Sequence, residues 1–71
     1  MRSKLIKWEK NHGYKGKFVA EKIGCSDATW SMIKNGKQNP TVEHLNKFND
    51  AFPSVQDVLS LFEDVKGENN D

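Results

Sequence analysis

The sequence has little of what several classes of protein require. A single cysteine, Cys25, among 71 residues excludes an internal disulfide framework and fits a reducing cytoplasm. No apolar run approaches the roughly 20 residues that cross a membrane, and no signal-peptide pattern opens the chain. We therefore expect a cytoplasmic protein with one small domain, residues 1–65, and a polar frayed tail, residues 66–71.

Groups that carry catalysis or hold cofactors are equally scarce. His12 and His44 have no cysteine or carboxylate partner at metal-ligand spacing, and no glycine-rich phosphate loop is present. We expect no enzyme activity, no metal and no cofactor. The spacing of Trp8 and Trp30 places both in the core, although exposed tryptophans would stack on single-stranded bases.

Charge is abundant but unevenly distributed. Residues 1–37 hold nine Lys/Arg and three acids, a balance of +6, while residues 38–71 hold two lysines and seven acids, a balance of −5. A basic N-terminal half suits phosphates or an acidic protein surface. A solvated surface with chance asymmetry is the plain alternative.

Apolar spacing and capping residues predict an all-α bundle of five short helices and no strands. Ser54, with Asp57 three residues later, resembles a capping box for the last helix, which follows Pro53. The expected helices cover residues 3–12, 15–23, 26–35, 41–52 and 54 to 63 or 65.

The middle of the chain carries a helix-turn-helix pattern. Ala20 has almost no side chain, so a second helix can cross close above it. Gly24 permits the left-handed conformation that ends a helix, and Ser26 is suited to cap the next one. Apolar residues at helical spacing face inward on both sides of this turn: Val19, Ile23, Trp30 and Ile33.

Residues 4–52 resemble the lambda-repressor-like (Cro/repressor, XRE-type) helix-turn-helix family. Members this short resemble the Cro-like proteins and the modulators of repression (antirepressors) of temperate phages, in particular those of lactococcal phages. The resemblance implies a bacteriophage transcription regulator in the host bacterial cytoplasm. The joint spacing that carries it involves Ala20, Gly24, Ile33, Gly36, Asn39 and Pro40.

The positions at which this family contacts DNA carry unusual residues here. Where the family places a phosphate-binding glutamine, this chain has Gly16. The base-reading positions offer no bidentate amide or guanidinium, and the charge of Asp27 is repelled by phosphates. A protein partner, such as a repressor's DNA-reading surface, fits them better; inward packing of Thr29 and Met32 is the alternative. The candidate partner-binding or base-reading residues are Asp27, Ala28, Thr29, Ser31 and Met32.

Three further sets of residues are candidates for contacts. The family's ion pair between its first and third helices corresponds to Glu9 and Lys34 with the charges exchanged, so an exchange at both ends should preserve it. Phosphate contacts, or merely a solvated surface, are expected of Lys15, Lys17, Asn35, Lys37 and Gln38. The last helix is apolar on more than one face, because Leu61 and Val65 widen a stripe of Val55, Val58, Leu59 and Phe62. A homodimer or partner contact, rather than an ordinary core helix, is expected of Val58, Leu61 and Val65.

Three functions remain open. The first is an antirepressor that binds a phage repressor protein and alters operator occupancy in the lysis–lysogeny switch, touching DNA only weakly alone or within a complex. The second is a Cro-like dimer that reads an operator directly. The third is an antitoxin-type partner module with the same fold.

Overall fold

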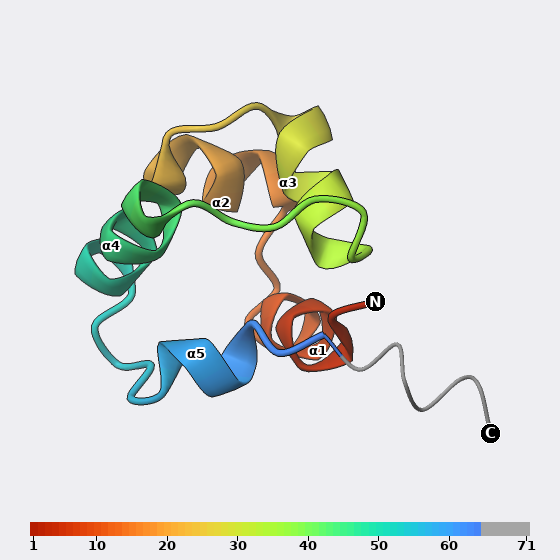
Figure 1. Ribbon diagram of the computed structural model, residues 1–71. Coiled ribbons are helices and arrows are strands. Elements are labelled where there is room, and N and C mark those ends of the chain that lie inside the picture. Colours follow the sequence, from red (N-terminus) through yellow and green to blue (C-terminus); the bar gives the residue numbers. More distant parts are fainter. Residues whose placement is uncertain (65–71) are drawn as a thin grey trace, which may run out of the picture.

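Five helices and no strand make up residues 1–64, the part of the chain that the computed structural model describes, which confirms the predicted all-α bundle. In Figure 1, α2 and α3 adjoin at one end of the bundle, α4 lies beside α2, and α5 lies beside α1 at the other end. The helices are α1 (Ser3–Asn11), α2 (Gly16–Ile23), α3 (Asp27–Lys34), α4 (Val42–Ala51) and α5 (Val58–Leu61).

One aromatic and aliphatic core joins all five elements. The Trp30 ring is fully buried and packs edge-on to Phe62, which in turn packs against Phe48. Trp8 is half-buried and packs against Phe48 and Phe52, so both tryptophans belong to the core as predicted. The buried apolar residues are Leu5, Val19, Ala20, Ile23, Trp30, Ile33, Phe48, Phe52 and Phe62.

The turn between α2 and α3 has the predicted geometry. Gly24 ends α2 with a φ of 79°, in the left-handed region that favours glycine. The Ser26 Oγ accepts a hydrogen bond from the Thr29 backbone N–H at 3.1 Å and so caps α3. Ala20 is buried where the two helices pack together. The Gly24 conformation and the Ser26 cap, both within the turn, therefore set how α3 follows α2.

Helix α5 is shorter than predicted, and the expectation of a Ser54 capping box is wrong. Asp57 is the N-cap instead, because its Oδ1 accepts from the Ser60 backbone N–H at 3.0 Å. The helix ends after Leu61, where the Phe62 carbonyl accepts a hydrogen bond from the side chain of Arg2.

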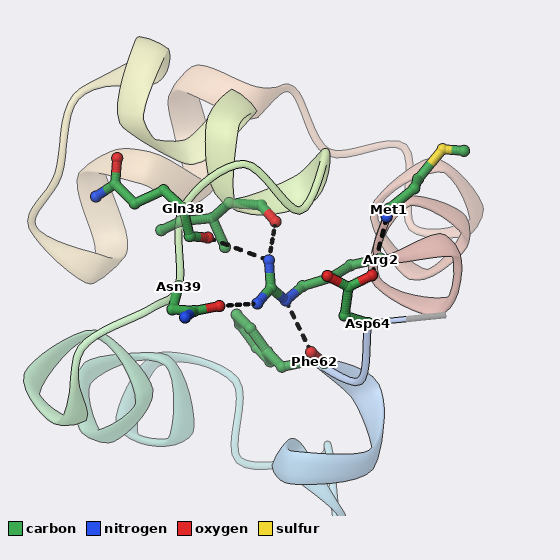
Figure 2. Close-up of polar contacts among 7 residues, drawn as sticks. Met1, Arg2, Gln38, Asn39, Phe62 and Asp64 are labelled. Atoms are coloured by element: carbon green, nitrogen blue, oxygen red, sulfur yellow. Dashed lines mark hydrogen bonds and ion pairs between the residues drawn. The ribbon is translucent and has the colours of Figure 1, made fainter. Parts of the chain in front are cut away.

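The buried side chain of Arg2 is the main feature that sequence patterns did not predict. Its Nε donates to the Phe62 carbonyl at 2.8 Å, and its Nη1 donates to the Ile33 carbonyl at 2.6 Å. Nη1 also donates to the Gln38 carbonyl at 3.1 Å, and Nη2 to the Asn39 Oδ1 at 2.9 Å (Figure 2). One guanidinium, in a residue only 4% exposed, therefore joins the end of α3, the following loop and the end of α5.

Two exposed ion pairs also join the start of the chain to the segment that follows α5. The amino group of Met1 lies 2.9 Å from the Asp64 Oδ1, and the Lys4 Nζ lies 3.3 Å from the Glu63 Oε1. None of the helices within residues 1–64 combines the length and the apolar character needed to cross a membrane.

Candidate functional site

Four residues of α3 are exposed, whereas Trp30 and Ile33 on the same helix are buried. Met32 is 43% exposed, so its side chain does not pack in the core. Thr29 is half-buried and belongs partly to the helix cap, because its Oγ1 accepts from the Ser26 hydroxyl at 3.0 Å. We call the exposed residues Asp27, Ala28, Ser31 and Met32 the α3 surface.

Gly16 allows α3 to approach the start of α2 closely. A Cβ at this position would lie 3.0 Å from the Asp27 Oδ1 and 3.5 Å from both the Trp30 Cδ1 and the Lys34 Nζ. A glutamine here would therefore require the Asp27 carboxylate to shift by a few tenths of an ångström. That carboxylate also gains from its place near the N-terminus of α2, where the helix dipole favours negative charge.

A buried polar cluster fixes α3 against α1. The predicted pair of Glu9 and Lys34 is confirmed, with 2.7 Å between Oε1 and Nζ. The second carboxylate oxygen, Oε2, accepts a hydrogen bond from the Trp30 indole N–H at 2.6 Å. Glu9 therefore serves two donors on α3, of which the sequence indicated only one.

The hydrogen bond from the Trp30 indole to Glu9 changes the effect on stability that we expect from exchanging the charges of Glu9 and Lys34. We expect Glu9→Arg and Lys34→Glu each to lower the free energy of unfolding by about 2 kcal/mol, because each sets like charges against one another. The double variant should recover only part of the loss, since an arginine at position 9 cannot accept the Trp30 N–H. Thermal melts of the four proteins measure this cycle. Full recovery in the double variant would show that the hydrogen bond from Trp30 contributes nothing to stability. Additive losses would show that the ion pair of Glu9 with Lys34 contributes nothing.

The phosphate candidates fall into two groups. Lys15, Lys17 and Lys37 are exposed. Asn35 is exposed as well, but its Nδ2 donates to the Ser31 carbonyl at 2.9 Å. Gln38 is half-buried, and Figure 2 shows its side chain directed away from the Arg2 cluster that holds its carbonyl. Of these candidates, only the three lysines offer exposed positive charges that phosphates could reach.

The apolar candidates of α5 lie partly inside the bundle. Val58 and Leu61 are half-buried and pack against the core, and Val65 lies outside the described residues. Leu59, expected in the apolar stripe, is instead 74% exposed, as is Val42 on α4. Both line an open hollow of about 400 Å³ between α4 and α5.

His44 has a structural role at the start of α4, which sequence patterns did not predict. Its Nδ1 accepts from the Thr41 backbone N–H at 3.2 Å, while the Thr41 Oγ1 accepts from the His44 backbone N–H at 3.1 Å. This reciprocal pair is the capping box of α4. Among residues 1–64 no three histidine, cysteine or acidic side chains gather to hold a metal ion.

Cys25 is a half-buried thiol that packs against the core. Burial, and to a lesser extent the negative charge of Asp27, raise the pKa of Cys25 above its ordinary value. The thiol therefore stays protonated and unreactive at neutral pH.

We expect slow alkylation of Cys25, with a rate that rises with pH later than that of a free cysteine. Asp27→Asn should lower the pKa of Cys25 and speed the reaction at a given pH, because one of the two causes of the shift is removed. Iodoacetamide labelling followed by mass spectrometry over a pH series measures both. An unchanged profile in the variant would mean that Asp27 exerts no field at the thiol.

Comparisons with protein families, with curated proteins and with solved structures found no match for this chain.

Proposed function

We propose that this chain is a small transcription regulator of the temperate-phage type. As an antirepressor, it binds the DNA-binding domain of a repressor protein and thereby alters operator occupancy in a lysis–lysogeny switch. The observation that carries the proposal is the chemistry of the α3 surface, which lies where a helix-turn-helix protein would present its reading side chains to DNA.

The α3 surface suits a protein better than a DNA groove. Asp27, Ala28, Ser31 and Met32 offer a carboxylate, a methyl group, a hydroxyl and a thioether, all exposed. Bidentate readout of a base requires a guanidinium or a side-chain amide, and a carboxylate among phosphates is repelled. Methionine adapts to irregular protein surfaces, and Asp27 is placed to meet a basic residue of a partner.

Such a basic residue is what a repressor uses to bind its operator. If Asp27 pairs with this basic residue, the residue is no longer available to contact DNA. Protein and operator then compete for one surface.

A Cro-like operator-binding repressor is the second candidate, and the exposed Lys15, Lys17 and Lys37 favour it. These cations are available to phosphates, which supply affinity but carry no sequence information. The two candidates therefore differ in what the purified chain does with DNA.

We expect the chain alone to bind DNA weakly, with a Kd of about 1–100 μM at physiological salt and no sequence preference. Gel shifts with fragments of its own locus, compared with scrambled fragments of equal length, measure this. Tight retention of one fragment would reject the antirepressor proposal in favour of the Cro-like one.

A further inference from the structure

An aromatic hollow opens beside the start of α2, and no residue of the α3 surface lines it. It has a volume of about 490 Å³. Phe18 on its wall is 40% exposed, a large share for a residue type that is usually buried. We use the name aromatic hollow for the site lined by Gly13, Tyr14, Lys15, Lys17, Phe18 and Glu21.

The rings of the aromatic hollow are held by their neighbours, and a neighbour lies over one face of Tyr14 and one face of Phe18. His12 stacks on Tyr14 at 5.2 Å between centroids and 9° between planes, and Phe18 lies 5.1 Å from Tyr14. The Lys22 Nζ lies over the Phe18 ring, 5.4 Å from its centroid, and Phe52 packs edge-on to Phe18. A nucleic-acid base needs a free ring face to stack on, and these neighbours already cover one face of each ring. The open apolar hollow suits an inserted apolar side chain.

The charge around the aromatic hollow favours acidic residues on both sides of the inserted side chain. Lys15 and Lys17 line it and Lys22 stands over Phe18, while Glu21 is the opposing acid, so the four exposed charges sum to +2. An apolar floor with basic walls complements an apolar side chain between carboxylates.

We propose that the aromatic hollow is a docking site for an acidic segment of a protein partner. The segment inserts one aromatic or branched aliphatic side chain against Tyr14 and Phe18, and its carboxylates pair with the surrounding lysines. This site is separate from the α3 surface, and the proposal does not depend on the antirepressor function.

The test uses the intact chain and four probes in NMR titrations of the ¹⁵N-labelled protein. The first probe is a hexapeptide with leucine and phenylalanine between two pairs of glutamates. In the second, lysines replace the glutamates; in the third, serines replace the two apolar residues. The fourth is a single-stranded oligothymidine. We expect the first peptide to bind at least tenfold tighter than the other three, with the largest shifts at Tyr14 and Phe18.

Variants locate the site. Phe18→Ser and Lys17→Glu should each weaken binding of the first peptide at least fivefold. Lys17→Glu keeps the test valid if Phe18→Ser does not fold, because position 17 is exposed and an acid is favourable in the first turn of a helix. Leu59→Ser, which removes an exposed apolar side chain from the other hollow, should leave binding unchanged.

Three results would overturn the proposal. One is equal binding of the three peptides, and another is a set of shifts centred on Val42 and Leu59. Tighter binding of oligothymidine than of the first peptide would assign the aromatic hollow to nucleic acid.

Discussion

Replacing Arg2 by methionine should lower the free energy of unfolding by about 3 kcal/mol, because a hydrogen bond from a buried charged donor is worth about 1.5–3 kcal/mol and several of these bonds are lost together. The acceptors are the Asn39 Oδ1 and three backbone carbonyls, of which the Ile33 carbonyl keeps the Gly36 backbone N–H as a second donor. A chain of this size has only about 4–10 kcal/mol of stability in total. The melting temperature should therefore fall by more than about 10 °C.

Two variants separate the hydrogen bonds of Arg2 from its charge and its volume. Methionine keeps most of the volume, and Arg2→Lys keeps the charge but not the planar set of donors, so most of the loss should persist. Lys4→Met is the matched control, because its ion pair with Glu63 is exposed and worth no more than about 1 kcal/mol. Chemical denaturation measures all three. Equal stability of Arg2→Met and Lys4→Met would show that the cluster drawn in Figure 2 contributes nothing.

The contrast between α3 and α5 shows what could be predicted from sequence. The bounds of α3 follow from neighbours in the chain: Ser26 caps it, and Trp30 and Ile33 set its inward side. The exposed α3 surface follows from the same residues. The carbonyl that follows α5 is bonded instead by Arg2, which contacts Phe62 across an interval of 60 residues. No local pattern contains that information.

The same distinction holds for the sites. An ion pair of Glu9 with Lys34 was predictable, because the resemblance aligned the two positions. The indole bond from Trp30 was not, because it depends on the rotation of a ring in the packed core. The aromatic hollow was missed for another reason: its lining lies entirely within residues 13–21, but the 40% exposure of Phe18 is decided only by how the bundle packs.

Under the proposed function, Asp27→Lys should weaken binding to a repressor encoded at the same locus by about 30-fold or more, because truncating or reversing one member of a desolvated charge pair costs about 2–5 kcal/mol. Asp50→Lys is the matched control. Asp50 is an exposed residue of α4, and its replacement changes the net charge equally on a different helix. Asp57 is unsuitable as a control, because its side chain caps α5.

Calorimetric titration of the repressor's DNA-binding domain with each variant measures the loss, and circular dichroism verifies that each variant folds. Asp27→Asn removes the charge with less disturbance of the contact with Gly16, and should show an intermediate loss. Unchanged binding by Asp27→Lys with lost binding by Asp50→Lys would move the interface from the α3 surface to α4.

The most direct test of the proposed function is competition between this chain and operator DNA for the repressor. Fluorescence anisotropy of a labelled operator fragment, first saturated with the repressor and then titrated with this chain, reports the occupancy of the operator. The antirepressor account predicts a fall in anisotropy to the value of free DNA, and no such fall with Asp27→Lys. An anisotropy that stays constant, or a chain that displaces the repressor by binding the operator itself, would contradict it.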